Sequence, residues 1–222
     1  MFQLQSYSTF GLSASCNSIE SFVDVPSFLS LYNSIKQSAD NAVYILGGGS
    51  NSIFTKDFDG TVLVNEIKGI SHFDTESHHY LRVGAGENWH EFVSYCMNKS
   101  LHGYENLALI PGSIGAAPIQ NIGAYGAEIR DVLVELEAVD IQTGEPRVFS
   151  NAACRFGYRD SVFKRELKGR YAIWSVTLRL TRSGHEIRTG YGDIAGWLER
   201  EGIEAPGPPE VARAVIAIRK SK

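Results

Sequence analysis

"PGSIGAAPIQNIGAYG", residues 111–126, is the stretch that decides the fold of this chain of 222 residues. It lies within residues 106–127, which carry no charged side chain. A membrane span needs about 20 apolar residues, so the length alone would allow one. Pro111, Pro118 and Asn121 argue against a span, because they break a helix or require hydrogen-bond partners in lipid. The segment is therefore predicted to be side-chain-poor loop backbone in a protein without a membrane segment.

The composition is that of an ordinary globular protein, with 43% hydrophobic and 21% charged residues. A formal net charge of −4 argues against sequence-independent nucleic-acid binding, which requires a basic surface. Cys16, Cys96 and Cys154 are odd in number and far apart, which favours neither a disulfide framework nor a zinc site. Neither a signal peptide nor a heptad pattern is present, so we expect a monomeric protein of the reducing cytoplasm.

The charge is unevenly distributed along the chain. Basic residues outnumber acidic ones in residues 155–200, and the reverse holds in residues 1–154. A basic segment on an acidic protein can serve an anionic ligand, but it can also be a solvated surface. Charge alone favours the solvated surface.

Hydrophobic spacing predicts helices and strands in irregular alternation. Trp89, Phe92, Val93 and Cys96 follow the i, i+3, i+4, i+7 spacing of an amphipathic helix. Two more helices are predicted in 27–39 and 208–222, and strands are predicted at 42–46, 61–65, 79–86, 132–141, 146–149 and 171–180. More strands than helices, without regular alternation, indicate an α+β fold.

Two glycine-rich runs are candidates for ligand binding. In "YILGGGSNSIF", residues 44–54, glycines after a strand let backbone N–H groups converge on an anion, and hydroxyl and amide side chains follow. The run is neither a Walker A motif nor a Rossmann fingerprint, and a tight strand-to-loop turn is the simpler interpretation. In residues 111–126, Gly and Ala leave room for a flat ligand, and Gln120, Asn121 and Tyr125 offer uncharged hydrogen-bond groups. Together the two loops suit a phosphorylated aromatic cofactor such as FAD, although spacing alone does not distinguish FAD from other nucleotides.

Four motifs carry a resemblance to a known family: "LGGGSN" (46–51), "VGAGENWH" (83–90), "ENLALIPGSIGAAPIQNIGAYG" (105–126) and "CRFGYRDSVFK" (154–164). In these motifs the chain resembles the UDP-N-acetylenolpyruvoylglucosamine reductases, over nearly its whole length. The resemblance implies an α+β, two-subdomain FAD-binding fold of the vanillyl-alcohol-oxidase/PCMH type. It further implies a first FAD-binding subdomain at 1–66, a second at 67–183, and a segment at 184–222 that leads to a third, substrate-binding domain absent from this chain.

The same resemblance implies a reaction. NADPH reduces FAD and leaves, and the reduced flavin passes hydride to the enolpyruvyl group of a UDP-sugar, giving UDP-N-acetylmuramate for peptidoglycan synthesis. In this family the third domain supplies the serine that donates the proton and a glutamate that assists it. We therefore expect this chain to turn over very poorly by itself.

Individual site residues follow from the matching positions. Arg159 in "GYRDS" matches the catalytic arginine, which would stabilise the charge that develops on the substrate carboxylate; a structural Arg159–Asp160 pair is the alternative. Tyr125, Tyr191 and Lys222 match substrate-facing positions, where the alternatives are a turn-packing tyrosine, a half-buried aromatic side chain and a lysine that complements a helix dipole. The expected cofactor-binding residues are Gly47, Gly48, Gly49, Ser50, Asn51, Ser52, Ile110, Pro111, Gly112, Ser113, Gly115, Ala116, Ile119, Ile122, Gly123 and Ile173.

Other functions stay open at this point. A non-catalytic FAD-binding module would keep the loops without the chemistry, and a flavin oxidoreductase of the sugar-oxidase type would often hold its flavin covalently. No metal site is expected, because His72, His78, His79 and His102 have no cysteine or carboxylate partner at ligand spacing. His90 is expected on the solvent side of its helix.

Overall fold

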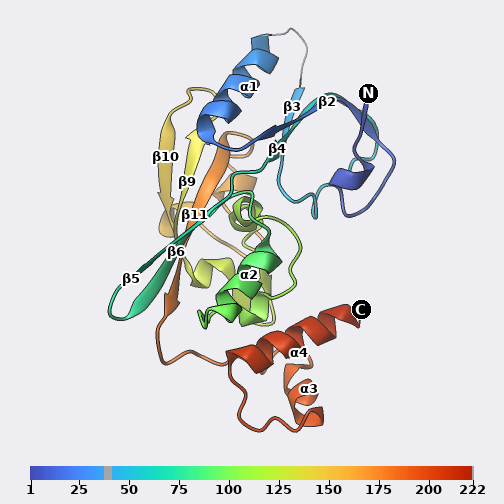
Figure 1. The fold of residues 1–222 in the computed structure, drawn as a ribbon. Helices are drawn as coiled ribbons and strands as arrows, with labels where there is room; N and C mark the ends of the chain where they lie inside the picture. The colour runs from blue at the N-terminus through green and yellow to red at the C-terminus, as the bar shows by residue number, and fades with distance from the viewer. Residues whose placement is uncertain (38–41, 222) are drawn as a thin grey trace.

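The computed structural model describes residues 1–37 and 42–221. Its N-terminal part is a four-stranded sheet in the order β1 (Phe2–Gln3), β2 (Ser15–Phe22), β4 (Phe58–Asn65), β3 (Ala42–Leu46). Both β2 and β3 run parallel to β4, and β1 is antiparallel to β2. Helix α1 (Val25–Gln37) connects the two parallel neighbours of β4 and lies at the top of the molecule in Figure 1.

A five-stranded antiparallel sheet forms the centre of the molecule. Its order is β10 (Pro146–Ser150), β9 (Leu133–Asp140), β11 (Tyr171–Thr181), β6 (His78–Gly84), β5 (Ile70–Asp74). A cluster of apolar side chains joins the two sheets: Phe22, Phe28 and Leu63 pack with Val139 and Ala172. The sheets therefore share a core, and the loops at their junction are held close together.

Helix α2 (Trp89–Asn98) covers part of the larger sheet, as the spacing predicts. Asn88 caps its N-terminus, with Oδ1 accepting a hydrogen bond from the Glu91 N–H at 3.0 Å. Trp89, Phe92, Val93 and Cys96 are buried in the main core. The Trp89 indole also donates to the Leu107 carbonyl at 2.9 Å, which ties the helix to the uncharged segment.

The uncharged segment folds as short turns rather than as regular structure. The 3₁₀ helix η2 (Glu105–Leu107) overlaps its start, η3 (Ile114–Gln120) and the two-residue strand β7 (Gly123–Ala124) lie within it, and the two-residue strand β8 (Ala127–Glu128) overlaps its end; η4 (Ile129–Asp131) follows. Further 3₁₀ turns are η1 (Gln5–Tyr7), η5 (Ala152–Cys154) and η6 (Val162–Lys164). Within residues 1–37 and 42–221, no helix combines the length and the apolar character that crossing a bilayer requires.

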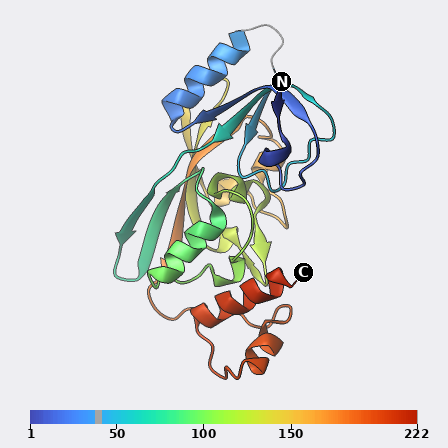
Figure 2. The same ribbon diagram turned by 45° about the vertical axis from the view of Figure 1, so that its right-hand side comes forward.

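Helices α3 (Ile194–Arg200) and α4 (Pro208–Lys220) lie at the end of the molecule opposite α1 (Figures 1 and 2). Val211, Ala214 and Val215 of α4 are buried in the main core, so this helix is part of the folded body. The predicted α+β class and all the predicted helices and strands are present, with small shifts at their ends; residues 38, 39 and 222 of the predicted helices lie outside the described part. Strands β1, β2, β5, β7 and β8 and helix α3 are not predicted by the sequence.

Candidate functional site

A cavity of about 680 Å³ opens where the two sheets meet. It is bounded by α1, by β3 and the glycine loop after it, by residues 111–122, and by the start of β11. Its volume lies within the roughly 300–1,000 Å³ typical of ligand pockets. The two glycine-rich loops predicted from the sequence therefore border the same cavity.

The predicted cofactor-binding residues mostly line this cavity. Those that do are Gly47, Gly48, Gly49, Ser50, Asn51, Ser52, Pro111, Gly112, Ser113, Gly115, Ala116, Ile119, Ile122 and Ile173. Ile110 and Gly123 are not among its lining residues, although each is next to one in the sequence. The cavity wall is thus almost the one that the motifs predict.

The two glycine-rich loops contact each other as well as the cavity. A Cβ added to Gly48 would lie 2.8 Å from the Cα of Gly112, so the two backbones approach more closely than side chains allow. Hydrogen bonds fix this contact: the Ser50 hydroxyl donates to the Pro111 carbonyl at 3.1 Å, and the Asn51 amide donates to Gln120 Oε1 at 3.0 Å. Part of the glycine content therefore serves loop packing rather than a ligand.

The backbone of the first loop suits an anion. Within the described residues, the N–H groups of Gly49, Ser50 and Asn51 donate to no protein acceptor. Successive unpaired N–H groups in a glycine-rich turn form an anion-binding concavity. A cradle of this kind, beside a largely apolar cavity, fits the pyrophosphate and the flat ring of a flavin dinucleotide.

Three lysines on the cavity wall were missed by the sequence analysis. Lys36 of α1, Lys164 and Lys168 all line the cavity. The excess of basic residues in 155–200 indicates positive charge near Lys164 and Lys168, but charge alone favours a solvated surface there. That interpretation does fit Arg155 and Arg165, which form ion pairs with nearby acidic side chains. The lysines add positive charge where an anionic ligand would lie.

Arg159 is not among the cavity-lining residues; it lies in the tight turn between Gly157 and Asp160 and contacts the backbone on either side of Ile122, which does line the cavity. Its guanidinium donates to the Gly123 carbonyl through Nη2 and to the Asn121 carbonyl through Nη1, the latter at 3.3 Å. Its backbone has φ +52°, an uncommon conformation for a side chain of this size. The alternative of an Arg159–Asp160 pair is wrong, since Asp160 pairs with Arg165 at 3.2 Å instead.

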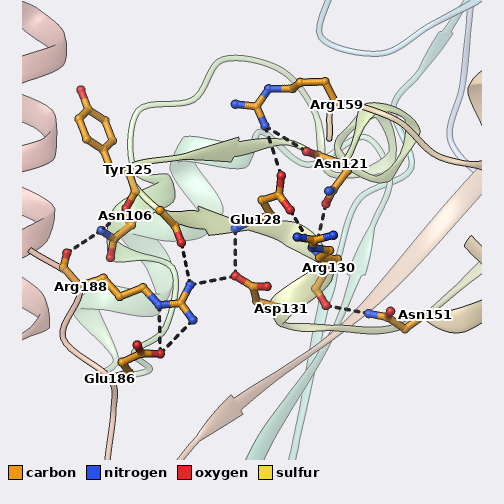
Figure 3. A network of polar contacts seen from close by, with 11 residues as sticks. Asn106, Asn121, Tyr125, Glu128, Arg130, Asp131, Asn151, Arg159, Glu186 and Arg188 are labelled. Atoms are coloured by element: carbon orange, nitrogen blue, oxygen red, sulfur yellow. Dashed lines mark hydrogen bonds and ion pairs between the residues drawn. The ribbon is translucent and has the colours of Figure 1, made fainter. Parts of the chain in front are cut away.

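The carboxylate of Glu128 lies between two guanidinium groups (Figure 3). Its Oε1 is 4.0 Å from Nη1 of Arg159, and its Oε2 is 2.7 Å from Nε of Arg130. The Glu128 side chain is only 17% exposed. This arrangement keeps one negative charge beside Arg159.

The hydrogen-bond role expected for Asn121 at a ligand is wrong. Its side chain is fully buried; Nδ2 donates to the Gly157 carbonyl at 2.9 Å, and Oδ1 accepts from the Arg130 N–H at 3.2 Å. Its backbone is left-handed, with φ +47°. Asn121 thus joins the uncharged segment to the turn that carries Arg159.

Tyr125 and Tyr191 contact each other, with ring centroids 6.4 Å apart in an edge-on arrangement. Tyr191 is 63% exposed, whereas Tyr125 is largely buried. In Figure 3 the Tyr125 ring points away from the polar network around Glu128 and Arg188. The structure therefore brings Tyr125 and Tyr191 together, and Lys222 lies outside the described residues.

The prediction for His90 is wrong. Its ring is half-buried, and Nδ1 accepts a hydrogen bond from the Leu109 N–H at 3.1 Å. Burial, together with the positive charge of Lys220, lowers the pKa of His90. The Leu109 carbonyl accepts from Arg219 of α4 at 3.1 Å, so both helices hold the backbone just before the cavity wall.

The reason given against a metal site is also wrong for two histidines. Oδ1 of Asp74 lies 2.7 Å from Nε2 of His72 and 2.7 Å from Nδ1 of His79. The three residues come from neighbouring strands, which sequence spacing does not reveal. This cluster lies outside the cavity and is considered separately below.

Comparison with known proteins agrees with the cavity. The model of a family described as "FAD binding domain" matches residues 33–150. The UDP-N-acetylenolpyruvoylglucosamine reductase of Flavobacterium johnsoniae is 42% identical over 222 residues, with 100% of this chain and 65% of the relative covered. The enzyme of the same name from Burkholderia cenocepacia is 45% identical over 223 residues, covering 99% of this chain and 63% of the relative. The predicted resemblance is confirmed, although the chain spans only about two thirds of the length of these relatives.

Solved structures support the fold. The UDP-N-acetylenolpyruvylglucosamine reductase of Thermus caldophilus aligns with a TM-score of 0.63 at 19% identity, covering 99% of this chain and 67% of that one. Cholesterol oxidase of Brevibacterium sterolicum aligns with a TM-score of 0.53 at 18% identity, covering 72% and 33%. The predicted vanillyl-alcohol-oxidase/PCMH fold is confirmed. From the matched residues and the cavity that they border, we conclude that the chain belongs to the family of FAD-binding domains, with FAD as its cofactor.

Proposed function

We propose that this chain provides the flavin site and the substrate-activating arginine of a UDP-N-acetylenolpyruvoylglucosamine reductase. Residues 1–66 and 67–183 would form two FAD-binding subdomains, and residues 184–222 would follow as the segment next to a substrate-binding domain. The names of the relatives support this proposal. The observation that carries it is the Arg159 guanidinium, held by the Asn121 and Gly123 carbonyls on either side of the cavity-lining residue Ile122.

The residues that would hold FAD are those of the two loops. Residues 47–52 would bind the pyrophosphate through backbone N–H groups, with Lys36 or Lys164 adding positive charge. Residues 111–122 would lie against the isoalloxazine ring, since Gly, Ala and Ile side chains leave a flat apolar wall. Bound FAD supplies hydride transfer, taking hydride from NADPH and giving it to the enolpyruvyl double bond of the UDP-sugar.

Arg159 would act on the substrate carboxylate. Hydride addition to the vinyl carbon places negative charge on the neighbouring carboxylate, and a fixed cation at that point lowers the barrier. A guanidinium suits this task because it stays protonated and its five N–H donors can bind carbonyl groups and a carboxylate together. The carbonyls of Asn121 and Gly123 use only part of this capacity. Tyr125 and Tyr191 would close over the sugar nucleotide from the adjoining surface.

FAD binding is tested by titrating the flavin with the purified chain and following flavin fluorescence. Gly48→Ala adds a Cβ against Gly112 and should weaken binding, because overpacking costs about 1–3 kcal/mol. The matched control is Gly190→Ala, where a Cβ meets nothing within 4 Å. Equal affinity in both variants would contradict the proposed loop contact, and no binding by the unmodified chain would contradict the proposed function.

Hydride transfer is tested in a single turnover, which does not require repeated protonation. The flavin in the loaded chain is reduced with NADPH without oxygen, the enolpyruvyl UDP-sugar is added, and recovery of the oxidised flavin spectrum is measured. Arg159→Met should slow recovery by about 10²–10³-fold, whereas Arg213→Met on the exposed face of α4 should not. Absence of recovery in the unmodified chain would favour a non-catalytic module. Flavin that stays bound after denaturation would favour an oxidase with a covalent cofactor.

A further inference from the structure

A compact group of metal-ligating side chains lies on the β5–β6 hairpin, outside the cavity. His72 and Asp74 are two residues apart on β5, so they share one face of the strand. His79 on β6 is the direct cross-strand partner of Asp74. Cross-strand partners project to the same face with neighbouring Cβ atoms, so the backbone register brings all three side chains together.

The donor atoms form a small triangle. Oδ1 of Asp74 lies 2.7 Å from Nε2 of His72 and from Nδ1 of His79, and the two nitrogens are 3.4 Å apart. Donors bound tetrahedrally at about 2.0 Å from a zinc ion lie about 3.3 Å from one another. The nitrogen–nitrogen edge already has this length. The two edges to oxygen must open by about 0.6 Å to reach it, and the half-exposed Asp74 side chain can make that movement.

The surroundings leave each donor available. The other carboxylate oxygen of Asp74 is 3.7 Å from Nη1 of Arg182, which also donates to the Thr75 carbonyl at 3.0 Å. This contact orients the carboxylate and leaves Oδ1 facing the two rings. Within the described residues, Nδ1 of His72 and Nε2 of His79 have no protein partner. Each ring can therefore carry its proton on that nitrogen and present the inner nitrogen as a ligand.

We propose that His72, Asp74 and His79 form a binding site for a divalent transition-metal ion of the zinc type. Two imidazole nitrogens and one carboxylate oxygen suit borderline ions, whereas Mg²⁺ and Ca²⁺ prefer oxygen ligands alone. The three side chains are 30%, 41% and 16% exposed, so the remaining coordination position faces water. On binding, the inner proton of each neutral ring moves to its outer nitrogen through solvent.

The ion would bind only the folded hairpin, because the ligands on β5 and β6 are assembled by strand pairing. β5 is the edge strand of its sheet and pairs with β6 alone. A ligand that binds the native state stabilises it in proportion to the logarithm of its concentration. Metal binding would thus stabilise the pairing of the edge strand β5 with β6, independently of the flavin cavity.

The test is calorimetric titration of the metal-stripped, tag-free chain with Zn²⁺ alone. We expect one ion per chain. His72→Ala and His79→Ala should each weaken binding by more than the roughly 10- to 100-fold that loss of an outer partner costs, and Arg182→Gln should fall within that range. His78→Ala and His185→Ala, which change neighbouring histidines outside the cluster, are the controls and should bind as the unmodified chain does.

A second measurement keeps the test valid if a variant folds poorly. Co²⁺ bound by the unmodified chain should show visible absorption that added Zn²⁺ abolishes, and circular dichroism verifies folding of each variant. The buried cysteines Cys16, Cys96 and Cys154 should not contribute thiolate-to-metal bands. Absence of Zn²⁺ binding, or equal binding by folded His72→Ala and the control variants, would overturn the proposal while leaving the flavin site untouched.

Discussion

The Arg159 guanidinium occupies the space that a side chain at Gly123 would need. A Cβ at Gly123 would lie 2.7 Å from Nη1 of Arg159, 2.8 Å from Cγ of Glu128 and 2.9 Å from the Ala127 carbonyl oxygen. The Gly123 carbonyl also accepts a hydrogen bond from Nη2 of the same arginine. Gly123, which the sequence predicts to contact the cofactor, makes room for Arg159. The position of the Arg159 guanidinium is therefore coupled to the backbone at Gly123, next to the cavity-lining residue Ile122.

Gly123→Ala should displace Arg159 and destabilise the fold. Overpacking of this kind costs about 1–3 kcal/mol, and here a backbone oxygen prevents simple relief. FAD affinity should change little, because Gly123 is not among the cavity-lining residues. Chemical denaturation measures the first effect and flavin titration the second. A stable variant with much weaker FAD binding would show that Gly123 contacts the cofactor after all.

The two ion pairs of Glu128 should differ in strength. Oε2 is 2.7 Å from Nε of Arg130 and Oε1 is 4.0 Å from Nη1 of Arg159, so the charges of the pair with Arg130 are the closer ones. Both arginines are more than a third exposed, which limits each coupling to about 0.2–1 kcal/mol. A double-mutant cycle with Glu128→Gln and Arg130→Gln should give the larger value. The same cycle with Arg159→Gln should give the smaller one, and the reverse order would contradict the arrangement in Figure 3.

Asn121 should be one of the most sensitive positions in the uncharged segment. Asn121→Ala removes the hydrogen bonds to Gly157 and Arg130 from a fully buried site. We expect a loss of about 2–4 kcal/mol of unfolding free energy, because the Arg130 N–H loses its side-chain acceptor and alanine is strained at φ +47°. The Gly157 carbonyl keeps the Asp160 N–H as a donor at 3.2 Å.

The matched control at this position is Asn121→Gly. It loses the same bonds but tolerates φ +47°, so it should be about 1–2 kcal/mol less destabilised than Asn121→Ala. Equal urea midpoints for the two variants would show that the backbone conformation contributes nothing.

Hydrophobic patterns in the sequence predict those helices and strands whose own residues carry a clear apolar spacing or run. The spacing of Trp89, Phe92, Val93 and Cys96 identifies α2, and the apolar run of β3 identifies a strand, although only its last residue, Leu46, is buried rather than the whole strand. By contrast, β2 reads "SCNSIESF" and β5 reads "ISHFD", which are too polar to be recognised as strands. β2 depends on β4, which is distant in sequence, whereas β5 depends on pairing with β6 in the hairpin that follows it directly.

The residues of the candidate site also fall into those that a motif predicts and those that only the folded structure brings together. The glycine loops and Arg159 are visible as motifs, and they border or adjoin one cavity. The contact of Gly48 with Gly112 and the position of Lys36 on the cavity wall depend on how the two sheets pack, which no short motif encodes. The histidine cluster requires the β5–β6 register. The contacts that the sequence does not predict are tertiary contacts between residues far apart in the chain or on paired strands, whether or not those residues lie in a motif.

Acid should weaken the fold through His90. Burial and the nearby Lys220 lower the pKa of His90, and its neutral Nδ1 accepts the Leu109 N–H. The ordinary pKa of histidine is about 6.5, so below this pH His90 is protonated in the unfolded chain while it is still neutral in the folded chain. The contribution of His90 to the unfolding free energy should therefore be fully present at neutral pH, and it should fall as pH drops through 6.5 towards the lower pKa of the folded state.

His90→Asn should remove part of this pH dependence, because its Oδ1 can accept the same hydrogen bond and does not titrate. Some of the pH dependence of stability should remain, because burial and the nearby His185 also lower the pKa of His102. Thermal unfolding of both proteins between pH 5 and 8 makes the comparison, with His78→Gln at the surface as the control. If His90→Asn loses stability on acidification as steeply as the unmodified chain, protonation of His90 is not the cause, and the contact with Leu109 persists in acid.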